Sequence, residues 1–142
     1  MAGSMSNLDV INAFHSEMED YFRTGDDSAL VASFAPGCQV SVPGMPPTVE
    51  GLRQVLPAFR EALTDVAISL GEFVSSGDMI AYRISFTGTH SGPFMGVPAT
   101  GKRVTMSETH VDTIRDGKIA SHTGDIDMLG LLQQIGAVPA PA

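Results

Sequence analysis

The sequence has little of what would direct a protein to nucleic acid, to a membrane or to an oxidising compartment. Its 8 lysines and arginines face 16 acidic residues and form no basic run, which disfavours nucleic acid and anionic membranes as partners. No apolar run approaches the roughly 18–20 residues that a membrane-spanning helix needs. The single cysteine, Cys38, excludes an internal disulfide. We therefore expect a cytoplasmic protein without a nucleic-acid or membrane partner.

Several sequence signals are missing as well. The chain contains no internal repeat, no low-complexity segment, and no GxGxxG or P-loop motif of a nucleotide-binding fold. Its N-terminus lacks the charged and apolar regions of a signal peptide. What is present is a hydrophobic fraction of 43% in 142 residues, which is typical of one globular domain. We predict a cloning scar over residues 1–4, a single domain over 5–136 and a loose tail over 137–142.

Helical patterns dominate the first half of the chain. Apolar residues recur at helical spacing from Leu8 to Phe22, after a start signal at Ser6, and again from Gly51 to Leu63. A short helix is expected over Ser28–Phe34. Pro57 lies inside the Gly51–Leu63 pattern, where it is expected to bend or interrupt a helix.

Strand patterns dominate the second half. They cover Cys38–Val42, Val66–Ser75, Met79–His90, Lys102–Arg115 and Ile119–Ile126, and a helix is expected over Met128–Gln134. Ser76-Gly77 and Asp116-Gly117 are turn signals, so consecutive strands should run antiparallel, which is typical of an α+β fold. A single curved antiparallel sheet, with the N-terminal helices on its concave side, encloses a central pocket. The predicted fold is a cone-shaped α+β barrel.

Four segments resemble the SnoaL-like polyketide cyclases, which belong to the superfamily of nuclear transport factor 2, ketosteroid isomerase and limonene epoxide hydrolase. They are YFRTGD with FAPG, GTHSGPFMGVPATG, DGKI and DMLGLLQQIG, and they span nearly the whole chain. The resemblance implies a homodimer of α+β barrels. It also implies an enzyme of antibiotic biosynthesis that closes a ring in a polyketide by intramolecular aldol chemistry, without metal or organic cofactor.

The resemblance also implies which residues are catalytic. In the family, the acid–base residues are on the inner face of the last two strands, and the corresponding positions here are Glu108, where the family cyclases use glutamine, His110 and His122. Gly124 stands where the family has its catalytic aspartate. The neighbouring Asp125 is offset by one residue, which on a strand directs it to the opposite face.

The turn between the last two strands decides whether the two histidines meet. A two-residue loop of Asp116-Gly117 would direct His122 to the outer face. A three-residue loop with a bulge at Gly117 would pair His110 with His122 and Glu108 with Gly124. The resemblance favours the second register, which we adopt. The three side chains would then share a proton network, although an ion pair on the pocket floor would explain Glu108 and His110 equally simply.

The remaining pocket wall is predicted to be apolar. The residues expected to bind substrate are Phe14, Met18, Tyr21, Phe34, Met45, Phe59, Tyr82, Phe94, Met95, Met106 and Gly124. Two histidines and a glutamate are chemically able to bind a metal, but no supporting ligand motif is present and none is predicted. We interpret His15 and His90 as surface or pocket-rim residues. The Gly/Pro-rich loop Ser91–Gly101 is expected to be mobile and to gate the pocket.

The leading hypothesis is a cofactor-free cyclase that acts on a hydrophobic polyketide-type intermediate. Ring closure would occur either by a cycloaddition templated by the pocket or by histidine-assisted aldol or Michael chemistry. The alternatives are a small-substrate isomerase or hydrolase of the ketosteroid isomerase or epoxide hydrolase type, and a non-enzymatic module for ligand binding or dimerisation. A homodimer is expected through the outer sheet face, where Thr105, Ser107, Thr109, Val111 and Thr113 alternate outward.

Overall fold

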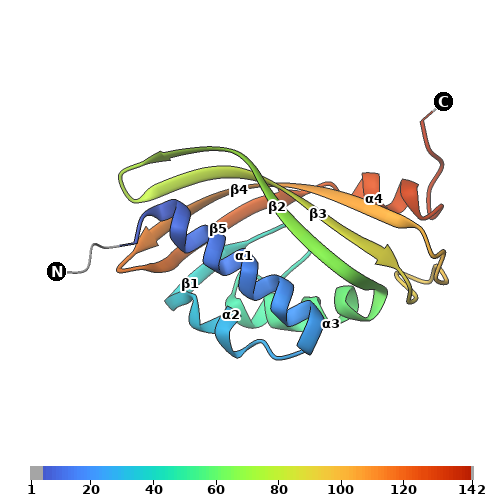
Figure 1. The fold of residues 1–142 in the computed structure, drawn as a ribbon, viewed down its shortest axis with the longest axis horizontal. Coiled ribbons are helices and arrows are strands. Elements are labelled where there is room, and N and C mark those ends of the chain that lie inside the picture. Colours follow the sequence, from blue (N-terminus) through green and yellow to red (C-terminus); the bar gives the residue numbers. More distant parts are fainter. Residues whose placement is uncertain (1–4, 142) are drawn as a thin grey trace.

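A curved five-stranded sheet forms one side of the molecule in the computed structural model, which describes residues 5–141 (Figure 1). The predicted scar at residues 1–4 lies outside the described residues. The elements in chain order are α1 (Asn7–Thr24), α2 (Ser28–Ala32), β1 (Phe34–Ser41), α3 (Val49–Ala62), β2 (Leu63–Ser76), β3 (Met79–His90), β4 (Arg103–Arg115), β5 (Lys118–Ile126) and α4 (Met128–Gln134). The predicted α+β cone is confirmed.

The strand order is β1-β5-β4-β3-β2, and the last four strands in sequence form the expected antiparallel meander. One aspect of the predicted sheet is wrong. Strand β1 joins the edge of β5 in parallel, so the sheet is mixed. Helix α3 follows β1 and returns the chain to the far edge of the sheet, where β2 begins.

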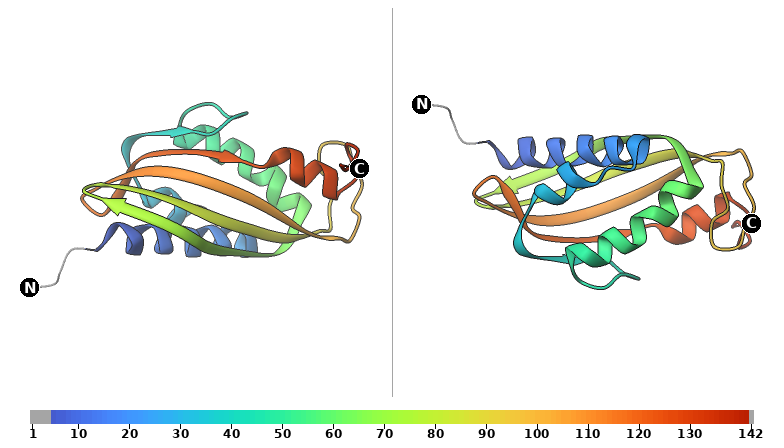
Figure 2. Two further views of the ribbon diagram at one scale, coloured as in Figure 1. Left: turned by 90° about the horizontal axis from the view of Figure 1, so that it is seen from above. Right: turned by 90° about the horizontal axis from the view of Figure 1, so that it is seen from below.

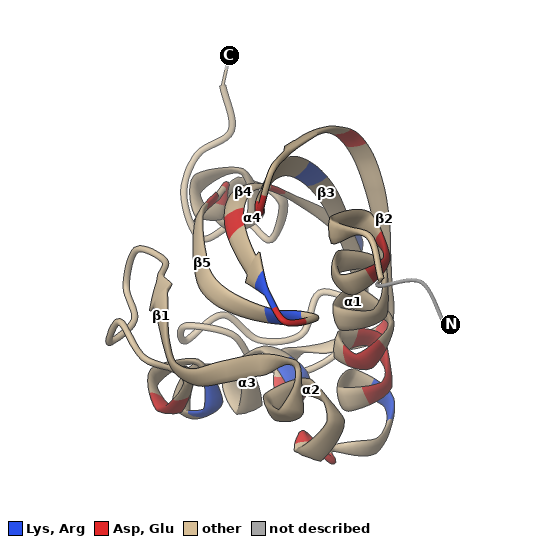
Figure 3. Ribbon diagram, turned by 90° about the vertical axis from the view of Figure 1, so that its left-hand side faces the viewer, with Lys and Arg blue, Asp and Glu red and all other residues tan. Residues whose placement is uncertain are grey.

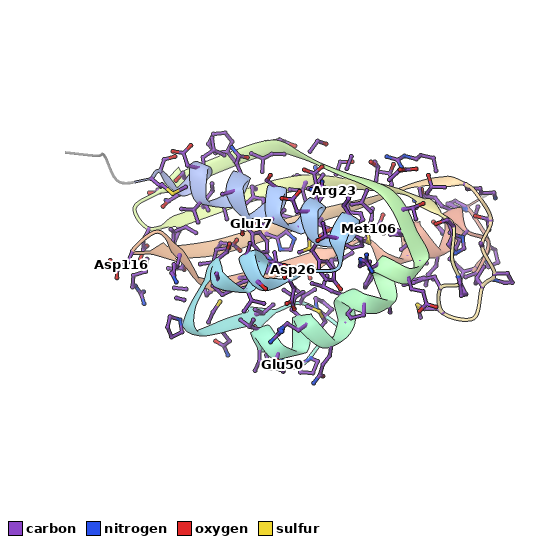
Figure 4. The ribbon with its side chains drawn as sticks, turned by 60° about the horizontal axis from the view of Figure 1, so that its bottom comes forward. Glu17, Arg23, Asp26, Glu50, Met106 and Asp116 are labelled. Atoms are coloured by element: carbon purple, nitrogen blue, oxygen red, sulfur yellow. The ribbon has the colours of Figure 1, made fainter. Side chains whose placement is uncertain are left out.

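Helices α1, α2 and α3 face the concave side of the sheet, whereas α4 lies at one end, near the C-terminus (Figures 1 and 2). The end-on view of Figure 3 shows the resulting ring of strands and helices. Acidic side chains such as Glu50 and Asp116 are exposed on its outside, and Met106 is buried within the fold (Figure 4). No helix among residues 5–141 is long and apolar enough to span a membrane.

Helix α1 begins and ends at the residues that the sequence signals. The Ser6 side chain accepts the backbone N–H of Asp9, and the Asp9 carboxylate accepts the backbone N–H of Ser6, a capping box. Gly25 ends the helix in the left-handed region, with φ of 80°. One face buries Val10, Ile11 and Phe14 against the sheet.

Helix α3 continues through Pro57 without the expected break. Pro57 lies on the exposed side of the helix. The proline ring therefore meets solvent, although the helix still lacks one backbone hydrogen bond there. The Thr48 side chain caps the helix by accepting the backbone N–H of Gly51. The opposite face, with Leu52 and Leu56, packs into the interior.

Strand β4 supplies the unusual part of the interior. Every second residue from Val104 to Ile114 is buried, as expected for a strand with one face on the core. Three of these inward positions are ionisable: Glu108, His110 and Asp112. Buried ionisable groups are costly unless they are hydrogen-bonded, so their partners determine what the site is able to do.

Candidate active site

A cavity lies between the concave face of the sheet and helices α1 and α3. Its lining is largely apolar, and the polar groups Glu108, His110, His122 and His15 gather in one part of it. The cavity is narrow: the volume open to the centre of a water-sized sphere is about 70 Å³. That space holds several waters. A drug-sized ligand requires a pocket of roughly 300–1,000 Å³, so a larger substrate requires the wall to move.

Neither register predicted for the β4–β5 hairpin is the observed one. Asp116 and Gly117 form a two-residue turn, with φ of 53° and 74°, and Arg115 pairs with Lys118. The pairing then shifts at Ala120, which has no partner on β4. Because this bulge adds one residue, His122 faces inward after all. It pairs with Asp112, whereas the prediction paired it with His110.

His110 pairs across the sheet with Gly124, and its ring covers that glycine. A Cβ atom on Gly124 would lie 2.0 Å from Nδ1 of His110, so only glycine leaves room for the ring. The predicted space at Gly124 is therefore occupied by His110 and does not line the cavity. Asp125 is exposed on the outer face, as its offset predicts.

The first hydrogen-bonded pair of the site joins His110 to Glu108. The Nε2–H of His110 donates to Oε1 of Glu108 at 2.8 Å, and both side chains are buried. The other ring nitrogen, Nδ1, is buried and has no hydrogen-bond partner. Neither nitrogen of His110 is therefore available to a ligand in this conformation. The group that the pair presents to the cavity is the Glu108 carboxylate.

The second pair joins His122 to Asp112, a residue that the sequence interpretation did not select. The Nδ1–H of His122 donates to Oδ1 of Asp112 at 2.8 Å, and the Tyr82 hydroxyl donates to Oδ2 at 2.8 Å. Asp112 has no exposed surface. Among the described residues, Nε2 of His122 makes no hydrogen bond, and His122 lines the cavity. The alternation along β4 that exposes Val111 and Thr109 was the signal that could have identified Asp112.

The rings of Tyr82, His110 and His122 form a stacked column. The His110 and His122 centroids are 4.4 Å apart, with an interplanar angle of 17°. Tyr82 continues the stack at 5.5 Å from His110. Phe14 and Phe34 contact His122 edge-on. The column is rigidly packed, and it explains why Tyr82 and Phe34, both predicted to bind substrate, instead lie behind the histidines.

Ligand atoms of His110, Asp112 and His122 lie within 4.8 Å of one another, close enough to raise the question of a metal. An imidazole binds a metal in the plane of its ring. Two nearly parallel stacked rings cannot both direct a lone pair at one ion, and Nδ1 of His122 already donates its proton to Asp112. This arrangement fits a proton-transfer site better than a metal site.

His15 belongs to the site, contrary to the prediction that it is a surface or rim residue. It is 8% exposed and lines the cavity from α1, and its Nδ1–H donates to the Ile11 carbonyl at 3.0 Å. Burial, followed by the nearby His110 and His122 rings, lowers the pKa of His15 from 6.5 to about 4. His15 is therefore neutral at pH 7, with Nε2 able only to accept a hydrogen bond.

Some of the residues predicted to form an apolar wall line the cavity, and others do not. Phe14, Met18, Met45 and Phe59 line the cavity. The other residues of the predicted wall do not line the cavity. Tyr21 and Met106 are core residues, Met95 is 69% exposed, and Phe94 packs behind Phe59 with the two ring centroids 5.1 Å apart. The cavity wall also contains apolar residues that periodicity alone did not assign to the pocket: Phe22, Val42, Leu52, Val55, Leu56, Ile68, Ile84, Phe86 and Ile126.

The loop Ser91–Gly101 is anchored at both ends. The backbone N–H groups of Ser91 and Gly92 donate to the Ala62 carbonyl. His90, which is buried and not on the rim as predicted, accepts the backbone N–H of Thr100. At the tip of the loop, the Phe94 ring packs against Phe59, and no residue of the loop lines the cavity, so the loop supports the wall from behind.

Cys38 is buried, and burial raises its pKa to about 11. The thiol is therefore protonated and unreactive at neutral pH, as expected for a small core residue.

The available acid–base groups are the Glu108 carboxylate and the Nε2 atom of His122, each oriented by a buried partner. Such a pair can remove a proton from carbon or oxygen and return one to an oxygen nearby.

Comparison with known proteins gives one family. The model of the SnoaL-like polyketide cyclases matches residues 12–135. Aklanonic acid methyl ester cyclase DnrD of Streptomyces peucetius is 35% identical over 65 residues, which are 46% of this chain and 45% of that protein. The corresponding cyclase DauD of Streptomyces sp. strain C5 is 34% identical over 87 residues, which are 56% of this chain and 54% of that protein. The chain thus spans about half the length of the curated relatives it matches.

Solved structures agree with this family. AclR of Streptomyces galilaeus, a proposed hydroxylase, superposes with a TM-score of 0.78 at 26% identity, over 92% of this chain and 83% of its own. IdmH of Streptomyces antibioticus, a proposed polyketide cyclase, superposes with a TM-score of 0.72 at 30% identity, over 88% of this chain and 97% of its own.

Proposed function

The chain belongs to the SnoaL-like polyketide cyclase family, and we propose that it closes a ring in a polyketide-type intermediate by acid–base chemistry, without a metal or an organic cofactor. One observation carries the proposal. Glu108 and His122 both line an apolar cavity, and each is hydrogen-bonded to a buried partner, His110 and Asp112 respectively. The names of DnrD and DauD support a substrate related to aklanonic acid methyl ester.

An aldol closure makes use of both groups. A base removes a proton from the carbon beside a carbonyl, the resulting enolate attacks a second carbonyl, and the new alkoxide takes up a proton. Glu108 and His122 are the two candidates for the base and the proton donor. His110 contributes through Glu108, because its own ring nitrogens are withdrawn from the cavity. The apolar wall excludes water and holds the chain in a reactive fold.

The templated cycloaddition remains the competing version of the same function. It fits the glycine at position 124, where the family's aspartate would stand, since it needs no proton transfer. The aspartate at position 112 favours acid–base chemistry, because it gives His122 a carboxylate partner by another route.

Rates of ring closure with His122→Ala and His110→Ala, measured on aklanonic acid methyl ester and on a panel of linear polyketides, distinguish the two versions. Acid–base chemistry predicts a loss of about 10²–10⁴-fold for His122→Ala. Templating predicts a loss of about tenfold for His122→Ala, equivalent to one hydrogen bond to the substrate, and a smaller loss for His110→Ala. Asp125→Asn on the outer face is the matched control. No ring closure by the wild-type protein on any substrate of the panel would contradict the proposed activity.

We also propose that the chain forms a homodimer through the outer sheet face. Apolar side chains are exposed there at Val111 (40%), Val74 (72%) and Met79 (48%), between small polar residues of β4. Such a face is better suited to a second sheet than to water.

A further inference from the structure

Asp112 is the most deeply buried acid among the described residues, and its hydrogen bonds indicate a role. Both of its oxygens are occupied: Oδ1 accepts from His122, and Oδ2 accepts from Tyr82, each at 2.8 Å. A buried carboxylate destabilises a fold unless it is fully hydrogen-bonded. An apolar residue would fill this core position at lower cost, so the acid requires another explanation.

The consequence for His122 is a fixed tautomer. A neutral imidazole carries its proton on either Nδ1 or Nε2. A carboxylate accepts hydrogen bonds and cannot donate them, so Asp112 holds the proton on Nδ1. The lone pair then lies on Nε2, the nitrogen that makes no hydrogen bond among the described residues and that belongs to a cavity-lining ring.

Tyr82 and the aromatic column limit the remaining freedom. The Tyr82 hydroxyl holds the carboxylate from the side opposite His122. The His110 ring stacks on one face of the imidazole, and Phe14 and Phe34 contact it edge-on. With its position and its proton both fixed, His122 has one orientation in which to meet a ligand.

We propose that Asp112, held by Tyr82, is a positioning residue that keeps His122 in the Nδ1–H tautomer with the Nε2 lone pair directed at the substrate. The catalytic meaning rests on the proposed function, whereas the tautomer does not. In the reaction, Nε2 takes a proton from the substrate carbon or hydroxyl, and the imidazolium keeps its Nδ1–H on Asp112. The proton then leaves Nε2 for the product alkoxide, directly or by way of Glu108, so no proton moves onto Asp112.

The test that needs no substrate is NMR of the ¹⁵N-labelled full chain at pH 8, where long-range ¹H–¹⁵N correlations identify the tautomer of each histidine. The wild-type protein should show His122 with its proton on Nδ1. In Asp112→Asn, the amide oxygen accepts from Tyr82 and the amide N–H₂ faces His122, so the proton should move to Nε2. Asp125→Asn removes the same charge from the outer face of β5 and should leave the tautomer unchanged.

Two results would overturn the proposal: a wild-type His122 protonated on Nε2, or an Asp112→Asn protein that keeps the wild-type tautomer. If Asp112→Asn does not fold, the wild-type spectrum still decides. Tyr82→Phe provides a milder variant, because it keeps the carboxylate and should keep the Nδ1–H form.

Kinetics then connect the tautomer to activity. Asp112→Asn should lower kcat by about 10²–10⁴-fold with little change in KM, since the substrate is still bound but meets the wrong nitrogen. If the wild-type protein has the Nδ1–H tautomer but closes no ring on any substrate, the proposed function fails and the positioning role stands. If the tautomer is reversed, the positioning role fails whatever the activity.

Discussion

Single residues at the polar part of the cavity have strongly unequal abilities to carry charge. His15 is the clearest case, because burial and the neighbouring imidazoles of His110 and His122 lower its pKa to about 4. In the unfolded chain its pKa returns to about 6.5. The native state therefore binds fewer protons than the unfolded state between these values, and this contribution to stability is present above pH 6.5 and is lost as the pH falls towards 4.

This difference predicts a pH-dependent effect of one substitution. Between pH 7 and pH 4, the wild-type protein should lose about 3 kcal/mol more unfolding free energy than His15→Gln, which cannot take up the proton. Urea unfolding of both proteins at the two pH values measures the effect. Asp and Glu residues titrate in both proteins and cancel in the comparison. Parallel losses in the two proteins would show that His15 is not buried in the neutral form.

Gly124 gives a second prediction at this scale. A Cβ atom there would lie 2.0 Å from Nδ1 of His110, so the ring must leave its place in the stack on His122. Gly124→Ala should therefore cost about 1–3 kcal/mol and turn His110 away from Glu108. Thermal unfolding gives the cost, and the His110 ring signals in NMR report its position. Asp125→Ala, at the next position of the same strand, is the control. Gly117→Ala is unsuitable as a control, because the φ of 74° at Gly117 would add backbone strain to any effect of the side chain.

The sequence allows the inward or outward direction of more strand residues to be predicted than were selected above. Alternation along β4 placed Glu108 and His110 inward and, by the same rule, requires Asp112 to face inward too. The resemblance drew attention to positions that the family uses, and Asp112 is not among them. His15 was misplaced for a different reason: a histidine on an amphipathic helix is compatible with either face until the tertiary contacts are known.

Among the elements, α3 combines a structural role with a local weakness. It forms one wall of the cavity through Leu52, Leu56 and Phe59, yet it contains Pro57, which removes one backbone hydrogen bond. Pro57→Ala should raise the free energy of unfolding by about 1–2 kcal/mol, less than the full helix penalty because proline also restricts the unfolded chain. Urea unfolding measures it. A less stable variant would contradict this prediction and would mean that the Pro57 ring makes a stabilising packing contact.

The hairpin of β4 and β5 shows where sequence reasoning about elements stops. The Asp-Gly turn was recognised, but the bulge at Ala120 has no signal of its own, since alanine fits a regular strand as well. The family pattern predicted that His122 faces inward. That its partner is Asp112 depends on the one-residue shift, which only the strand pairing shows. Similarly, no local pattern distinguishes a parallel β1 from an antiparallel one, because that direction is set by pairing with β5, which lies about 80 residues further along the chain.

The outer sheet face of the molecule exposes Val111, Val74 and Met79 among small polar residues, and the chain carries a formal charge of −8. Val111 belongs to β4, the middle strand of the sheet, and stands between the inward residues His110 and Asp112. Val111→Asp should convert the proposed dimer to a monomer, because it places a charge where two sheets would meet. Light scattering at micromolar concentration measures the mass, with Gln54→Asp on the exposed side of α3 as the control. A wild-type monomer under these conditions would contradict the dimer.

The narrow cavity has a consequence for how fast a ligand arrives. A hollow of about 70 Å³ admits waters but no polycyclic molecule, so the protein that binds one is a rarer, opened form of the protein described above. Association should then level off at high ligand concentration, at the rate at which the wall opens, and should not keep rising with encounter frequency. The measured dissociation constant exceeds the intrinsic one by the inverse of the opened fraction. Selectivity among substrates then depends partly on how often the cavity wall opens wide enough for each substrate to enter.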